Sequence, residues 1–211
     1  MATESITRRA QSYIFKRPSL RECLARGLIN HSALARQLCE ELKIEQFDGV
    51  LAAIKRFGNR LSLGAQDQNV MKLLRDVQIR VSNRLAIAVA SAPPNFEKLF
   101  LLQRRIRKER RRFNMIDGDD FITLLFSQQY MAEVEECVGS SLKSMVSNLA
   151  QINLVFDARI ETTPGVVAQV YGMLAYHGIN VREEMSCWTD VILVVDERDL
   201  ARTLAVFESI S

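Results

Sequence analysis

Apolar residues recur at helical spacing through the first 60 residues, with polar residues between them. This period predicts four helices, at residues 6–16, 18–26, 33–42 and 47–58, with Asn30 or Ser32 as the cap of the third. Two short helices joined by a tight turn have the outline of a helix-turn-helix. The sequence therefore predicts a helical, helix-turn-helix-like domain over residues 1–60.

The pattern changes after a polar and mixed stretch at residues 61–76, which we interpret as a linker or a short bridging helix. Runs rich in β-branched residues predict strands at 77–83, 85–90 and 121–127, with helices near 96–110 and 130–138. The last block repeats this order with strands at 152–158, 180–188 and 190–196 and helices at 165–178 and 199–210. We therefore expect an α+β protein whose helical domain and linker precede two units, at residues 77–148 and 149–211.

The second of these units is incomplete. Its order is βαββα, and the chain given ends at Ser211, directly after the closing helix, so no residues remain for a fourth strand. An open sheet edge invites pairing with another segment. We expect either the strand at residues 85–90 or a partner chain to supply the missing strand, and in the first case the two units interleave.

Composition excludes several functional classes. The chain has 211 residues, of which 48% are hydrophobic. It has no apolar run near the roughly 18 residues that span a bilayer, and no signal peptide, so we expect a cytoplasmic protein without membrane contact. Its four cysteines and two histidines lack metal-ligand spacing, and no phosphate loop, paired carboxylates or nucleophile elbow stands in the chain. We expect no metal, no cofactor and no catalytic residue, and hence not an enzyme.

The carboxy-terminal block resembles an ACT domain, the βαββαβ module that binds amino acids in regulated biosynthetic enzymes and transcription regulators. The resemblance rests on TTPGVVAQVYGMLAYHGIN, at residues 162–180, and on VILVVDERDL, at residues 191–200. It implies a ferredoxin-like fold and a ligand held at a helix amino terminus, where backbone N–H groups attract a carboxylate. The ligand-binding residues that it implies are Thr163, Pro164, Gly165, Val166, Val167, Asn180 and Val181. The alternative is that the prolines and glycines here only form turns.

The middle block, residues 77–148, would then be a diverged ACT-like unit, interleaved as in the regulatory region of aspartate kinases. SAPPNF, at residues 91–96, stands there in place of the TPG loop, which argues against ligand binding by that unit. Taken whole, with LINHSALARQLCEEL at residues 28–42 and VLAAIKRF at residues 50–57, the chain resembles archaeal proteins described as predicted regulators of amino-acid metabolism.

Charge is uneven along the chain, whose net charge is +3: residues 1–60 carry +5, residues 61–150 carry +3, and residues 151–211 carry −5. The basic amino-terminal part of the chain would be the part that meets any polyanion partner. If residues 33–42 and 47–57 form a helix-turn-helix, Gln46 can read a base, while Lys55, Arg56 and Arg60 can contact the phosphate backbone. Glu45 and Asp48 would face phosphates unfavourably there. The alternative is a helical bundle that serves dimerisation or docking.

RRIRKERRRF, at residues 104–113, is the densest basic run. Its default interpretation is the solvated end of a helix, favoured by the helix dipole. Its charge would also neutralise several phosphates. The residues concerned are Arg104, Arg105, Arg107, Lys108, Arg110, Arg111 and Arg112.

Together these observations predict an amino-acid-responsive transcription regulator, a homodimer in which a carboxy-terminal ACT domain controls a helical domain that binds double-stranded DNA. The alternative is a regulatory subunit that binds no DNA and docks on an amino-acid biosynthetic enzyme through its helical domain.

Overall fold

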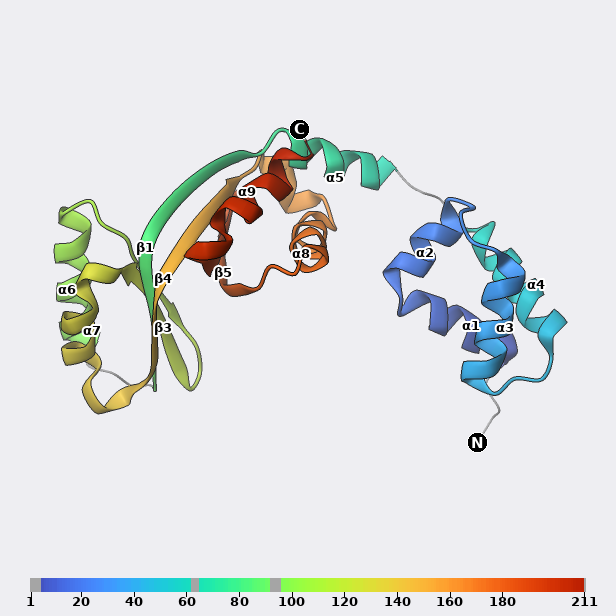
Figure 1. Cartoon of the computed structure of the whole chain (residues 1–211), viewed down its shortest axis with the longest axis horizontal. Helices are drawn as coiled ribbons and strands as arrows, with labels where there is room; N and C mark the ends of the chain where they lie inside the picture. Colours follow the sequence, from blue (N-terminus) through green and yellow to red (C-terminus); the bar gives the residue numbers. More distant parts are fainter. Residues whose placement is uncertain (1–4, 62–64, 92–95, 211) are drawn as a thin grey trace. The chain divides into compact units, whose positions relative to one another are not determined.

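The computed structural model describes residues 5–61, 65–91 and 96–210. The chain divides into two compact units, Met1–Gln68 and Asn69–Ser211, which we call the helical unit and the αβ body (Figure 1). Most of the SAPPNF segment lies outside the described residues. Among the described residues, no helix is both long and apolar enough to cross a membrane.

The helical unit packs four short helices around one apolar core. They are α1 (Ile6–Phe15), α2 (Pro18–Ala25), α3 (His31–Leu42) and α4 (Phe47–Gly58). Ser5 caps α1 and Asn30 caps α3, because their side-chain oxygens accept hydrogen bonds from N–H groups of the first turn. Leu38 and Ile54 are fully buried where α3 and α4 meet. The helices expected from the apolar period are therefore present, within a few residues of their expected ends.

The stretch that we interpreted as a linker or a short bridging helix carries α5 (Ala65–Arg75). Val70, Leu73 and Leu74 lie on one side of this helix, at the i, i+3 and i+4 spacing that makes an apolar stripe. All three are buried in the core of the αβ body. Residues 69–75 therefore belong to that body and are not a solvated connection.

The αβ body is built on a six-stranded antiparallel sheet in the order β2-β3-β1-β4-β6-β5 (Figure 1). The strands are β1 (Gln78–Ser91), β2 (Phe113–Asp117), β3 (Phe121–Ser127), β4 (Leu142–Val155), β5 (Val181–Cys187) and β6 (Asp190–Asp196). The helices are α6 (Phe96–Lys108), α7 (Met131–Val138), α8 (Val166–Tyr176) and α9 (Leu200–Glu208), with short 3₁₀ turns before α7, β4, α8 and α9. The α+β class is confirmed.

The two long central strands are shared between two βαββαβ arrangements. The second half of β1 begins the first unit, which continues through α6, β2, β3 and α7 and ends with the first half of β4. The second half of β4 begins the second unit, which continues through α8, β5, β6 and α9. Its fourth strand is the first half of β1, because residues 78–82 pair with residues 151–155.

This pairing corrects our expectation about the missing strand. Residues 85–90 do belong to β1, but they pair with β3 and with the first half of β4. The strand that completes the second unit is the segment just before them, and the same chain supplies it. Sequence reasoning also missed β2 and the first half of β4, because neither is a continuous apolar run.

Each shared strand has a bulge at its midpoint. The pairing shifts by one residue between Ser82 and Leu85, where β1 has the extra residue, and shifts back between Leu85 and Ile87, where β4 has the extra residue. Arg84 (φ 55°) and Asn148 (φ 58°) adopt left-handed backbone there. An extra residue exchanges the two faces of a strand. Ile79 and Ala86, which differ in parity, can therefore both face helices.

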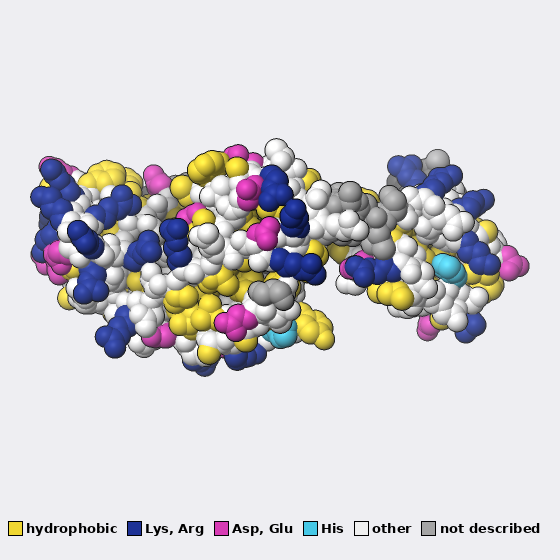
Figure 2. Space-filling model, turned by 90° about the horizontal axis from the view of Figure 1, so that it is seen from above, with side chains coloured by type: hydrophobic (Ala, Val, Ile, Leu, Met, Phe, Trp, Pro, Cys, Tyr) yellow, Lys and Arg dark blue, Asp and Glu magenta, His cyan; other side chains and the backbone are white. Residues whose placement is uncertain are grey.

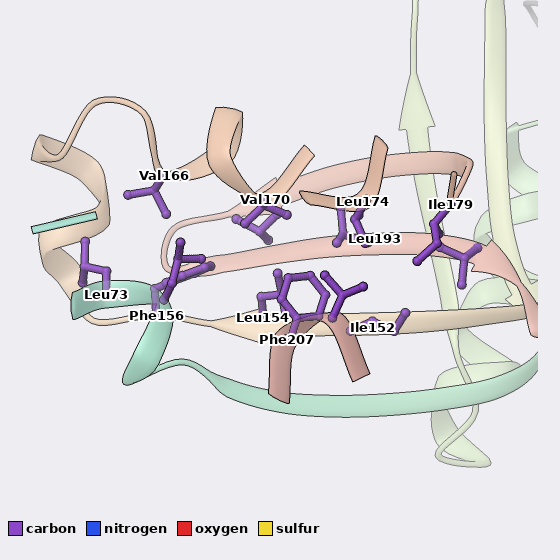
Figure 3. Close-up of a cluster of buried hydrophobic side chains, with 14 of the residues drawn as sticks. Leu73, Ile152, Leu154, Phe156, Val166, Val170, Leu174, Ile179, Leu193 and Phe207 are labelled. Carbon is purple, nitrogen blue, oxygen red and sulfur yellow. The ribbon is translucent and has the colours of Figure 1, made fainter. Parts of the chain in front are cut away.

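Two cores lie under the helices. One contains α6 and α7 against β1 and β3, with Leu99, Leu124 and Val134 fully buried. The other contains α5, α8 and α9 against β4 and β6. Figure 3 shows its side chains meeting from all of these elements, including Leu73, Leu154, Val170, Leu193 and Phe207.

A third cluster lies on the face of the sheet opposite the described helices. It contains Leu85, Ile87, Leu125, Leu149 and Val194. Asn114 on β2 and Met185 on β5 lie at opposite edges of the strand order, yet the Asn114 Nδ2 is 3.6 Å from the Met185 sulfur. The sheet therefore curls until its two edges approach, and this curvature buries the third cluster.

Candidate ligand-binding site

The loop between β4 and α8 is held by its own side chains. Asp157 accepts hydrogen bonds from the backbone N–H of Arg159 at 2.9 Å and from its Nε at 2.7 Å. These bonds, with the charge of the guanidinium, hold the pKa of the Asp157 carboxyl below its usual range. The Thr163 hydroxyl donates to the Arg159 carbonyl at 2.7 Å. A short 3₁₀ turn thus fixes the approach of the chain to α8.

Gly165 begins α8 in left-handed backbone, with φ 98° and ψ −11°. It provides no capping side chain, so the first N–H groups of the helix have no side-chain acceptor from the cap position. Such N–H groups, together with the positive end of the helix dipole, attract a carboxylate or another anion. A Cβ at Gly165 would lie 3.8 Å from the Val70 side chain, which places α5 close beside this loop.

The residues implied by the ACT resemblance do not all face this helix end. The Val166 side chain is 1% exposed and points into the core, so only its backbone can meet a ligand. Val167, by contrast, is 41% exposed. Val181 pairs with Val195 inside the sheet. Thr163 is half-buried, while Pro164 and Gly165 are exposed.

Asn180 lies at the opposite end of α8 from Gly165. The helix spans residues 166–176, which at 1.5 Å per residue is a length of roughly 16 Å. The loop before α8 lies instead at the end of β5, because the Phe156 N–H donates to the Thr189 carbonyl in the β5–β6 turn at 3.0 Å. One amino acid cannot contact both Gly165 and Asn180 of the same chain, which corrects our expectation of a single continuous site.

A buried polar ladder lies on the face of the same unit opposite the described helices, and sequence reasoning missed it. Gln151 is 2% exposed and Asn153 is 7% exposed. The Gln151 Nε2 donates to the Asn153 Oδ1 at 2.5 Å, and the Asn153 Nδ2 donates to the Asp190 carboxylate at 3.5 Å. The Gln151 Oε1 is buried without a hydrogen-bond partner among the described residues. The alternation of Gln and Asn with Ile and Leu in β4 was the signal for it.

The nucleic-acid candidates of the helical unit lie in the last turn of α4 and just outside its two ends. Gln46 precedes the helix, Lys55 and Arg56 are in its last turn, and Arg60 follows it, all with exposed side chains. Arg56 lies 3.5 Å from the Thr7 hydroxyl. Asp48, in the first turn, places a negative charge at the end of the helix that a helix-turn-helix would direct toward bases.

A second basic region of the helical unit was not assigned from the sequence. Arg9, Lys16 and Arg17 surround a cavity of about 400 Å³ between α1 and the end of α3. The Arg17 guanidinium lies 3.6 Å from the centre of the Tyr13 ring and forms an ion pair with Glu41 at 3.6 Å. These contacts give Arg17 a structural role.

The run at residues 104–112 spans two parts of the fold. Arg104, Arg105, Arg107 and Lys108 occupy the exposed side of α6, and Arg105 forms an ion pair with Glu133. Arg110, Arg111 and Arg112 belong to the connection from α6 to β2, where the Arg112 Nε donates to the Ser82 hydroxyl at 3.3 Å. Figure 2 shows Lys and Arg side chains gathered at the end of the αβ body that carries α6.

Known structures resemble this fold. Aspartate kinase from Clostridium acetobutylicum, described as an allosteric enzyme, matches with a TM-score of 0.51 and 14% identity over 64% of this chain and 34% of its own. A chain of the aspartokinase alpha and beta subunits matches with a TM-score of 0.50 and 12% identity, over 67% of this chain and 97% of its own. The regulatory subunit of aspartate kinase from Thermus thermophilus, in ligand-free form, gives 0.49 and 11%, over 63% and 95%.

The matches to the Clostridium kinase and to the aspartokinase subunit chain show a shared fold. The match spans about a third of the length of the Clostridium kinase but nearly all of the aspartokinase subunit chain. The sequence matches no protein-family model. It also matches no curated protein sequence.

Proposed function

We propose that this protein is an amino-acid-responsive regulator whose αβ body binds the ligand and whose helical unit transmits the response. The uncapped amino terminus of α8 carries the proposal, because its N–H groups and the left-handed Gly165 present donors to a carboxylate. The protein acts through binding and not through catalysis. The fold shared with an aspartate kinase described as allosteric supports a regulatory role.

A second copy of the chain supplies the remaining contacts of the site. Among the described residues, β5 is an edge strand whose outer side pairs with nothing, and such an edge invites a partner. In an antiparallel pair of β5 strands, the start of one lies opposite the end of the other. Asn180 precedes β5, and the loop before α8 lies at its end. Asn180 of one copy then meets the ligand at the α8 terminus of the other.

A thermal-shift panel of the twenty amino acids on the full chain tests ligand binding. A ligand that binds only the folded state raises the thermal midpoint with concentration. A flat response across the panel would contradict the proposal.

The Asn180→Ala variant then tests the shared site. Asn180 is exposed, so its loss should leave the free energy of unfolding of the unliganded protein within about 0.5 kcal/mol of the parent. Losing a hydrogen bond to a charged ligand should weaken binding by about 1.5–3 kcal/mol. Asn59→Ala, an exposed asparagine of the helical unit, is the matched control. Equal affinities of the two variants would remove Asn180 from the site.

We further propose that the helical unit transmits the response by binding double-stranded DNA. Lys55, Arg56 and Arg60 lie together at the end of α4 and can contact phosphates. A gel shift with random duplex should show binding that weakens steeply as salt rises. Replacing the three residues with glutamine should lower the affinity and the salt dependence together. Absence of binding at low salt would refute the DNA role.

One observation favours the alternative, a regulatory subunit that docks on a biosynthetic enzyme. Glu45 and Asp48 lie at the start of α4, where they repel phosphates. An amino-acid response in the thermal-shift panel without any DNA binding would support this alternative.

A further inference from the structure

A polar cavity lies at the junction of the two interleaved units. Its volume is about 690 Å³, within the range of small-molecule sites. Seven of its eight lining residues are polar or cationic, the eighth is Met131, and none is acidic. The two cations are Arg84 and Arg111. A cavity with this lining is suited to an anion.

The fold fixes both arginines at this place. Arg84 is the left-handed residue of the β1 bulge, and Ser147 precedes the corresponding residue of the β4 bulge, Asn148. The Asn148 N–H donates to the Gln128 side chain at 3.2 Å, which joins the bulge to the start of the turn before α7. The cavity therefore exists because two strands are shared between the two units.

The backbone around Arg111 is anchored as well. Its N–H donates to the Ile106 carbonyl at 3.1 Å, closing the end of α6. On the next residue, the Arg112 N–H donates to the Ser127 hydroxyl at 3.1 Å, and the Ser127 N–H returns a bond to the Arg112 carbonyl at 3.0 Å. Arg111 is thus positioned between α6 and the end of β3, toward the same cavity as Arg84.

No acidic residue of the described part of the chain lines the cavity. Among the described residues, neither Arg84 nor Arg111 forms an ion pair. Glu109, two residues from Arg111, instead accepts a hydrogen bond from the Tyr130 hydroxyl. The cavity is also lined by Gln128 and Gln129 of the 3₁₀ turn that leads into α7, which carry neutral amide side chains.

We propose that this cavity binds a small metabolite that carries a phosphate group. Guanidinium groups match phosphate oxygens with paired N–H donors. The neutral amides and hydroxyls of Asn83, Gln128 and Ser147 provide further donors for the remaining oxygens. The volume leaves room for an organic part beside the phosphate. The site is separate from the α8 terminus, so the proposal does not depend on amino-acid binding.

Calorimetric titration of the full chain with inorganic pyrophosphate, at low and moderate ionic strength, tests the proposal. The double variant Arg84→Gln/Arg111→Gln should weaken binding by about tenfold or more, from the loss of two charged hydrogen-bonding groups. Arg104→Gln/Lys108→Gln removes the same charge from the exposed side of α6 and should retain binding. Asn180→Ala should also retain it, which separates this site from the proposed amino-acid site.

A second variant guards against misfolding of the first. Ser147→Asp places a carboxylate at the cavity wall, keeps both arginines, and should also weaken pyrophosphate binding by repulsion. No binding to the parent chain, or equal losses in the two charge-removing double variants, overturns the proposal. Binding of citrate without pyrophosphate overturns the phosphate assignment. Binding of a single-stranded oligonucleotide through Arg84 and Arg111, without pyrophosphate binding, overturns the small-molecule assignment.

Discussion

Sharing β1 and β4 between the two units predicts that the αβ body unfolds as one. Leu124 lies in the core under α6 and α7, and Leu154 lies in the core under α8 and α9; both are 0% exposed. Neither half of the sheet can lose its strands without removing a strand from the other half. Leu124→Ala and Leu154→Ala should therefore lower the midpoint of the same thermal transition.

The magnitude follows from the burial. A fully buried leucine replaced by alanine costs about 2–5 kcal/mol. At about 2–4 °C per kcal/mol for a body of this size, either variant should lower the thermal midpoint by roughly 4–20 °C. Ile54→Ala in the helical unit is the control, because Ile54 is fully buried in a separate core.

Differential scanning calorimetry of the three variants measures these shifts. Leu124→Ala and Leu154→Ala should move one common transition, and Ile54→Ala should move the transition of the helical unit. A scan in which Leu124→Ala and Leu154→Ala move two different transitions would refute the coupling. A stable, folded fragment of residues 149–211 would refute it independently, since that fragment lacks the first half of β1.

Three further predictions follow from local geometry. Gly165→Ala, at φ 98°, should destabilise the fold by about 1–3 kcal/mol. Gly172→Ala, with open space around its Cβ within α8, should stabilise it by about 0.5–1 kcal/mol. Urea unfolding measures both changes in the free energy of unfolding, and changes of the same sign would contradict the prediction. Burial raises the pKa of the Cys137 thiol, so iodoacetamide at neutral pH should label the exposed Cys187 before Cys137. Mass spectra give the order of labelling, and labelling of Cys137 before Cys187 would show the prediction to be wrong. Because the pKa of Asp157 is lowered in the folded state, its stabilising effect is present above the unfolded pKa of about 3.9 and is lost as the pH falls through the folded pKa. The thermal midpoints of Asp157→Asn and the parent should therefore converge in acid. A difference between the midpoints that grows in acid would count against this prediction.

Much of the local structure could be predicted from the sequence. The apolar period, with a cap at Asn30 or Ser32, predicted the helices of the helical unit, and the continuous apolar run within residues 190–196 predicted β6. Gly165 was identified as the start of α8. These features depend on neighbours a few residues apart, so the sequence near each position was enough to indicate them.

The tertiary structure decided which segments meet. Strand partners are chosen among distant residues, so the pairing of residues 78–82 with the end of β4 could not be predicted from the local pattern. The bulge at Arg84 depends on this pairing, and so does the cavity that places Arg84 beside Arg111. The length of α8 separates Asn180 from Gly165, although the sequence suggested one site. Local patterns thus determined the elements, while long-range pairing determined the shared sheet and the positions of its candidate sites.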